Sequence, residues 1–239
     1  MPEPHIVKSY DDELGRLNDA IARMAGLAET QLTQAIQALV ERDDQRAAQV
    51  IASDAEVDRF EEMVNEQVAR LLALRAPVAD DLRVALSALK VAASLERMAD
   101  YAANAAKRSL VLNQLPPIPA LRSLSRMGWL VIELSKEVMD CYLERDADRA
   151  MIAWERDQEV DELHSSLFRE LLTYMMEDPR NIASCTHLLF IAKNVERIGD
   201  LATNIAEMTW YLVNGGGLRR ARPKRDTSAY AMPRGDRSQ

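Results

Sequence analysis

The chain is 239 residues long and has a net charge of −8, although residues 214–239 carry seven Lys/Arg against two Asp. Residues 1–213 are therefore strongly acidic, which argues against nucleic acid as the main partner. No stretch resembles a signal peptide or approaches the length of a membrane span, so we expect a cytoplasmic protein whose two cysteines, Cys141 and Cys185, stay reduced. Ala, aliphatic and charged residues dominate over Gly and aromatics, and this composition predicts an all-α fold.

Apolar residues recur at helical spacing in six segments of the chain. Asp43-Asp44 supplies an N-cap between the first two segments, Pro77 ends the second, and Asp80-Asp81 is expected to cap the third. The predicted helices run from about Lys8 to Arg42, from Asp44 to Leu74, from Asp80 to Asn113, from Ala120 to Glu144, from Asp146 to Met176, and from the break at residues 178–181 to Val213.

Two segments fall outside this helical pattern. The stretch Leu115-Pro116-Pro117-Ile118-Pro119 predicts a stiff linker. Asn214-Gly215-Gly216-Gly217 stops the last helix, and the basic residues beyond it lack apolar periodicity, so we expect a disordered tail. The predicted organisation is a first three-helix unit at 1–113, a linker at 114–119, a second three-helix unit at 120–213 and a basic tail at 214–239.

The second unit repeats the first. Residues 95–104 read Leu-Glu-Arg-Met-Ala-Asp-Tyr-Ala-Ala-Asn, and residues 195–204 read Val-Glu-Arg-Ile-Gly-Asp-Leu-Ala-Thr-Asn. Glu41-Arg42-Asp43 returns as Glu144-Arg145-Asp146, at an offset of 103 rather than 100 residues. The small difference falls in the turn between the second and third helices of each unit. The sequence therefore predicts two tandem antiparallel three-helix bundles related by an internal repeat.

Pairs of carboxylates four residues apart occur on the second and third helix of each unit. Residues at this spacing lie on one face of a helix, here in line with or beside the apolar stripe. Because the two helices are antiparallel neighbours, four carboxylates can meet at one seam, where they repel unless protons or cations intervene. Oxygen ligands of this kind suit Mg²⁺, Mn²⁺, Fe or Zn²⁺. The candidate metal ligands are Asp54, Asp58, Glu96 and Asp100 in the first unit and Asp157, Asp161, Glu196 and Asp200 in the second.

The same acids are compatible with two alternatives to a regulatory metal site. The protein can be a metal-free helical adaptor whose acids only form ion pairs, with Arg97 and Arg197 reaching acids on a neighbouring helix. It can also be a di-iron carboxylate enzyme, although such bundles use Glu-x-x-His from two helices, and only the segment from Asp161 to His164 comes near this pattern. No Gly-rich phosphate loop, Ser/His/Asp set or cysteine pair at ligand spacing is present, so we expect no enzymatic activity.

The duplicated Glu-Arg-Met/Ile-x-Asp motif, followed by Ala and Asn, resembles the PhoU family of phosphate-uptake regulators. The segments Leu71-Leu72-Ala73-Leu74-Arg75-Ala76-Pro77 and Asp81-Leu82-Arg83 resemble it as well, and the likeness covers about residues 8–213. It implies two three-helix bundles, often dimeric, with multinuclear metal sites at the motifs. Carried over to this chain, those sites are the eight carboxylates named above.

The resemblance also implies a function. The family couples a phosphate ABC transporter to a sensor histidine kinase and represses the phosphate-starvation response when phosphate is ample. We therefore expect a negative regulator whose partners are the transporter ATPase and the kinase, and which is peripheral at the membrane through them. The chain departs from the family pattern at Met98-Ala99, where Ile-Gly is usual, and at Asn181-Ile182-Ala183, where a second Asp-Leu-Arg is missing. The basic tail is a further departure, which could touch anionic lipid.

Overall fold

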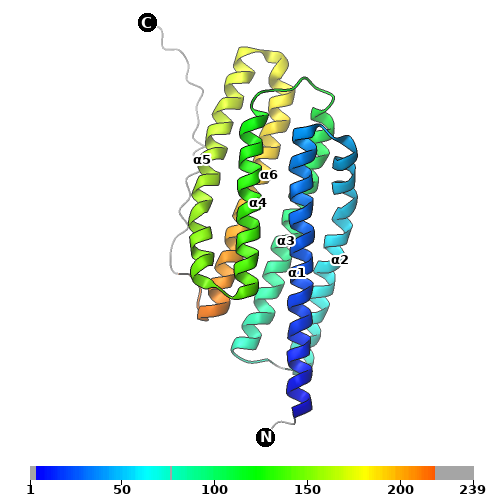
Figure 1. The fold of residues 1–239 in the computed structure, drawn as a ribbon, viewed down its shortest axis with the longest axis vertical. Helices are drawn as coiled ribbons and strands as arrows, with labels where there is room; N and C mark the ends of the chain where they lie inside the picture. The colour runs from blue at the N-terminus through cyan, green and yellow to red at the C-terminus, as the bar shows by residue number, and fades with distance from the viewer. Residues whose placement is uncertain (1–3, 76, 219–239) are drawn as a thin grey trace.

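The computed structural model describes residues 4–75 and 77–218, which form six α-helices and one short 3₁₀ turn. The all-α prediction is confirmed, and every helix begins and ends within a few residues of its expected bounds. The elements are α1 (Pro4–Glu41), α2 (Asp44–Arg75), α3 (Asp80–Leu112), α4 (Leu121–Glu144), α5 (Ala147–Glu177), η1 (Pro179–Asn181) and α6 (Ile182–Asn214) (Figure 1). Within these ranges no helix is long and apolar enough to cross a membrane. Residues 219–239 of the predicted disordered tail lie outside the described residues.

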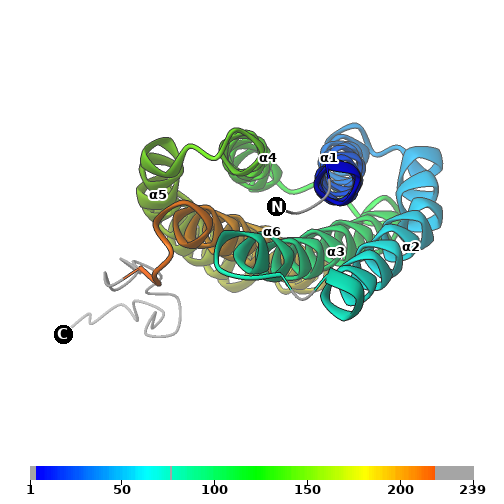
Figure 2. The same ribbon diagram turned by 90° about the horizontal axis from the view of Figure 1, so that it is seen from below.

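The two halves of the chain pack side by side and are offset along the long axis, so that α1 extends beyond the second half at one end and α5 and α6 extend beyond the first half at the other (Figure 1). Seen end-on, α3 and α6 lie next to each other, α1 and α4 lie above them, and α2 and α5 occupy the two outer ends (Figure 2). Helix α3 packs against α1, α2 and α6, and α6 packs against α3, α4 and α5. The seam between the second and third helices, which carries the candidate ligands, is therefore present in each half.

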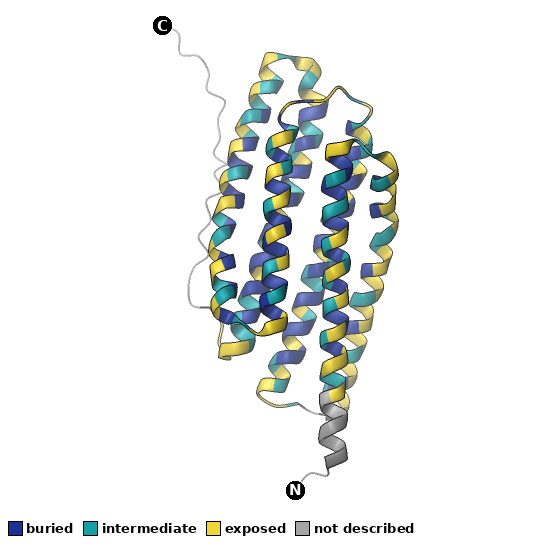
Figure 3. Cartoon of the chain, in the orientation of Figure 1, coloured by how far each residue is buried: buried dark blue, intermediate teal, exposed yellow. Residues whose placement is uncertain are grey.

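A single hydrophobic core runs through both halves. Its buried residues form one stripe on each helix, and these stripes face inward (Figure 3). Gly128 of α4 allows α1 to come close, because a Cβ atom there would lie 2.6 Å from Cδ1 of Ile36. Across the α3–α6 contact, the Arg108 guanidinium stacks over the Phe190 ring at 4.1 Å. The two bundles are thus joined by continuous packing as well as by the linker.

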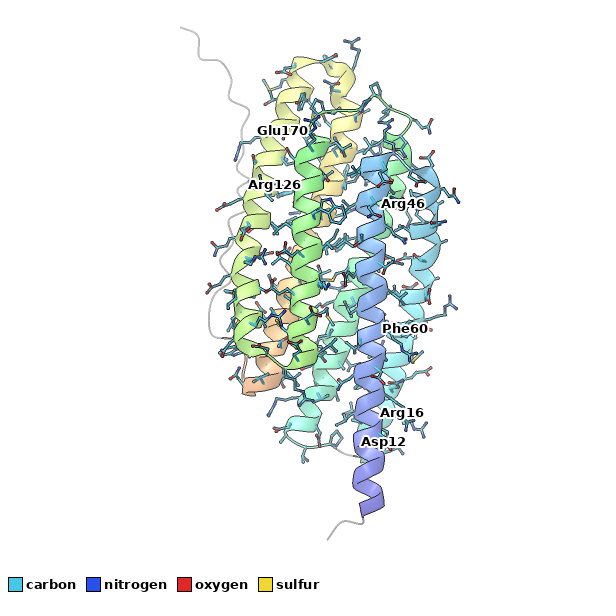
Figure 4. All side chains as sticks on the ribbon, in the orientation of Figure 1. Asp12, Arg16, Arg46, Phe60, Arg126 and Glu170 are labelled. Carbon is cyan, nitrogen blue, oxygen red and sulfur yellow. The ribbon has the colours of Figure 1, made fainter. Side chains whose placement is uncertain are left out.

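The first turn of each half is built in the same way, which supports the internal repeat. An Arg in the left-handed conformation is followed by an Asp whose side chain accepts a hydrogen bond from the backbone N–H three residues later. The Arg that supplies this N–H also pairs with the Glu that precedes the turn. In the first half these are Arg42, Asp43, Arg46 and Glu41, with Arg46 labelled in Figure 4, and in the second half they are Arg145, Asp146, Arg149 and Glu144.

The linker is held against the body of the protein by Arg42. Its Nη2 donates to the carbonyl oxygens of Leu112 at 3.2 Å, Asn113 at 2.7 Å and Leu115 at 2.8 Å. These acceptors include the end of α3, whose last carbonyls have no partner within the helix. Ile118 of the linker is buried in the common core. A stretch expected to be stiff is therefore also packed.

The prediction that Asp80-Asp81 caps α3 is wrong. Ala79 precedes the helix with a φ of 48° and makes no side-chain capping hydrogen bond. Asp80 is already inside the first turn, where its carboxylate pairs with Arg83. Asp80 and Asp81 therefore support the helix through its dipole, as acids in a first turn do, and not as caps.

Replacing Arg42 by Gly is expected to lower the free energy of unfolding by about 2 kcal/mol, because charge-assisted hydrogen bonds to three carbonyls are lost. Arg145→Gly is the matched control, since Arg145 has the same left-handed backbone but no such acceptors among the described residues. Gly relieves backbone strain at both sites, so the control is expected to be neutral or slightly stabilising. Urea unfolding measures both, and equal effects would contradict this role for Arg42.

Candidate metal centre

The first-half seam brings the predicted carboxylates of α2 and α3 close together. The pKa of Asp54 is raised by burial and then by the neighbouring charges of Asp100 and Asp58, while Lys107 opposes the shift. Charges influence each other in this way only over short distances. An acid pair on one helix therefore faces an acid pair on the next, as the repeat predicted.

Glu96 lies at the centre of this repulsion. Its pKa is raised from 4.5 to about 7, first by burial and then by Asp100, Glu61 and Asp58, with Arg97 acting in the opposite direction. A nearby cation would remove the cause of this shift, because it favours the charged form of each carboxylate. The seam therefore has the electrostatic character of a cation site.

Glu61 is a member of the cluster that the sequence pattern did not predict. It lies three residues after Asp58 and so one turn further along the same face of α2. At the repeat offset of 103 its counterpart is His164, which follows Asp161 at the same spacing. His164 is buried in α5.

The second-half seam is more deeply buried. Asp157, Asp161 and Glu196 are 3%, 4% and 5% exposed, and the Asp200 side chain is 14% exposed. Helices α5 and α6 approach closely at Gly199, where a Cβ atom would lie 3.2 Å from Oδ1 of Asp157. The matching position in the first half is Ala99, the departure from the Ile-Gly pattern.

The second-half acids on α6 already have cationic partners. Lys193 Nζ lies 2.9 Å from Oε2 of Glu196, and Arg197 Nη1 lies 3.3 Å from Oδ2 of Asp200. Arg197 therefore pairs with an acid of its own helix, whereas the metal-free adaptor alternative has it reach an acid on a neighbouring helix. The first-half counterpart of Lys193 is Ala93, which cannot neutralise Glu96. The two seams share their acids but differ in their cations.

The predicted ligands lie on adjacent helices in each half, but they do not form a ready-made cage. Within the described part of the chain, no three or more His, Cys, Asp or Glu side chains converge on one point as metal ligands do. The donor chemistry nevertheless fits a hard cation, since the first seam consists of carboxylate oxygens that repel one another. Asn104 and Asn204, one turn beyond the motifs, are exposed. The metal ligands stay a prediction.

The fold and the duplicated seams define a class of protein, an all-helical tandem repeat with an acidic seam in each half. The PhoU domain family model matches residues 21–109 and 124–209, one match in each half. A phosphate-specific transport system accessory protein PhoU homolog of Caulobacter vibrioides (strain NA1000 / CB15N) is 50% identical over 223 residues, which are 93% of this chain and 97% of that protein. The chain belongs to the PhoU domain family, and the resemblance seen in the sequence is confirmed.

Solved structures support the same conclusion. The crystal structure of PhoU from Pseudomonas aeruginosa superposes with a TM-score of 0.84 at 35% identity, covering 87% of this chain and all of that one. The phosphate transport system regulatory protein PhoU from Streptococcus pneumoniae gives a TM-score of 0.81 at 29% identity, covering 88% of this chain and 100% of that chain. The six-helix arrangement described above is therefore the arrangement of the family.

In buffer with a chelator, Glu96→Gln is expected to stabilise the protein at a pH of about 8 and much less at a pH of about 5. Because the pKa of Glu96 in the folded state, about 7, exceeds its ordinary value of 4.5, the folded protein holds a proton that the unfolded chain releases in this interval. The free energy of unfolding of the wild type therefore falls as the pH rises through it, and Gln removes that loss. Urea unfolding at both pH values measures the difference.

Glu196→Gln provides the contrast for this measurement. It removes the partner of Lys193 and is expected to destabilise the protein at both pH values. A Glu96→Gln protein that is less stable than the wild type at a pH of about 8 would show that Glu96 is not under net repulsion.

Proposed function

We propose that this protein is a negative regulator of phosphate uptake and of the phosphate-starvation response. The observation that carries the proposal is the match over 93% of the chain to a relative named as a phosphate-specific transport system accessory protein. The protein acts in the cytoplasm and reaches the membrane through its partners, in keeping with the absence of a membrane-crossing helix among residues 4–75 and 77–218. It couples a phosphate ABC transporter ATPase to a sensor histidine kinase.

The shape of the molecule supports a role in protein contacts. Two similar bundles, packed into one body, offer long helical faces to partners, and a homodimer doubles these faces. Membership of an accessory and regulatory family favours a non-enzymatic role. A di-iron bundle uses a His from each of two helices, whereas in this chain only His164 of the second unit follows an acid of the motif at the required spacing, so the sequence gives little support to the di-iron alternative.

Metal ions take part in this function by neutralising the acidic seams. Asp54, Asp58, Glu96 and Asp100 hold the metal in the first half, with Glu61 beside them, and Asp157, Asp161, Glu196 and Asp200 hold it in the second. A bound ion supplies positive charge and open coordination positions for a carboxylate of a partner or for phosphate. The first seam is expected to bind more tightly, because no counterpart of Lys193 competes with the ion there.

Deleting the gene in its own bacterium tests the regulatory role. In phosphate-rich medium, phosphate uptake and a reporter driven by a phosphate-starvation promoter are both expected to rise, because repression of the kinase is lost. A plasmid copy of the gene restores low values. If both readouts stay low in the deletion strain under ample phosphate, the protein is not the negative regulator proposed here.

Elemental analysis of the untagged protein, purified without chelator, tests the metal. Stoichiometric metal is expected, and it is expected to be absent when Glu96, Asp100, Glu196 and Asp200 are all replaced by Ala. Glu62→Ala/Glu66→Ala is the matched control, an exposed acid pair at the same spacing on α2, and is expected to retain the metal. No metal uptake on titration would favour the metal-free adaptor. A four-residue variant that still regulates normally would remove the metal from the function.

A further inference from the structure

A groove is lined by residues of α1, α3 and α4. Helices α1 and α4 lie on the face of the molecule away from α3 and α6 (Figure 2). The volume of the groove is about 150 Å³, and its floor is formed by Leu95 and Met98 of α3. One wall is a stretch of α1 with small side chains, from Ala22 to Ala28, and the other is α4 from Ser135 to Leu143. The absence of large side chains on α1 leaves this part of the seam unfilled.

Ser135 indicates that the groove takes a ligand with a polar group. The residue is 7% exposed, and its Oγ has no hydrogen-bond partner among the described residues. A buried hydroxyl without a partner is costly, and most buried polar groups in proteins are paired. An apolar floor with one unsatisfied hydroxyl suits an aromatic ring that carries its own hydroxyl, and a cavity of this size is large enough for one ring.

The rim of the groove favours a cationic ligand. Glu29 of α1 and Asp140 of α4 stand on opposite sides of it, with Lys136 as the one cation in its lining. The body of the protein around it is strongly acidic. A segment with a tyrosine between basic residues would complement both the floor and the rim.

Such a segment exists in this chain. Residues 219–239 contain seven Lys/Arg and a single aromatic residue, Tyr230. The described chain ends at Leu218, which packs on the common core. It follows Gly215, where a Cβ atom would lie 3.2 Å from Nη1 of Arg83 at the start of α3. The groove floor is 12 to 15 residues further along α3, about 18–23 Å away along the helix. The eleven residues between Leu218 and Tyr230 allow a span of up to about 40 Å when extended, which exceeds this distance along the helix and leaves length for the crossing to the α1–α4 face.

We propose that the α1–α4 groove is the docking site of the chain's own basic tail. The Tyr230 ring lies on Leu95 and Met98, and its hydroxyl pairs with Oγ of Ser135. The arginines on either side of Tyr230 lie beside Glu29 and Asp140. This inference is independent of the proposed function, because it concerns neither the acidic seams nor phosphate.

Limited proteolysis of the full chain with trypsin tests the proposal, since the tail carries seven Lys/Arg within residues 219–239. Docking protects the tail, so Tyr230→Ala is expected to speed its cleavage by about tenfold or more, and Tyr230→Phe by less, because the ring is kept. Ala25→Leu fills the groove and is expected to release the wild-type tail in the same way. Ala48→Leu, at an exposed alanine of α2, is the matched control and is expected to leave cleavage unchanged.

A photo-crosslinking amino acid at position 230 of the full chain locates the tail directly. Crosslinks to residues 22–29 or 135–143 within one chain are expected. Crosslinks to the α2–α3 acidic seam, or between two chains, would overturn the assignment, as would a wild-type tail that is cleaved as fast as that of Tyr230→Ala. Each variant is checked for its helical content and thermal unfolding before these results are compared.

Discussion

The packing of α3 against α6 is the contact on which the rest of the structure depends. These two helices each touch three others, so every remaining helix is placed relative to them. Close approach on several sides requires small buried side chains, and α3 has Ala at most of its buried positions, while α6 uses Gly199 where α5 comes nearest. The same two helices carry the Glu-Arg motifs. The positions of the acidic seams therefore follow directly from the way the core is assembled.

Duplication has given two seams with the same acids and different electrostatics. In the second half, Lys193 and Arg197 compensate the acids of α6 from within the same helix. In the first half Glu96 has mainly acidic neighbours, and its pKa is raised accordingly. The two seams thus differ in how much of their acidic charge is compensated from within the protein. Equivalent positions in a repeat do not imply equivalent chemistry.

Much of the fold could be predicted from the sequence, because helical periodicity and a regular spacing between repeats are local signals. The carboxylate neighbours were predictable for the same reason. The cap of α3 was not, because the carboxylate of Asp80 has a choice of partners and pairs with Arg83. Glu61 was missed because the prediction considered only acids four residues apart, and Glu61 lies three residues after Asp58. Whether Arg197 pairs along its own helix or across a seam depends on side-chain rotamers, which spacing does not determine.

The contacts of Arg42 and Ile118 have a consequence for how the molecule can transmit a signal. A linker that is hydrogen-bonded and buried, between halves that share one core, leaves no hinge at the middle of the chain. A sequence with two bundles would suggest two domains that move relative to each other, but in this molecule both bundles are packed into one body. Helix α1 alone, with 38 residues, is about 57 Å long. Two proteins bound near opposite ends of this molecule are therefore held at a fixed distance and orientation relative to each other.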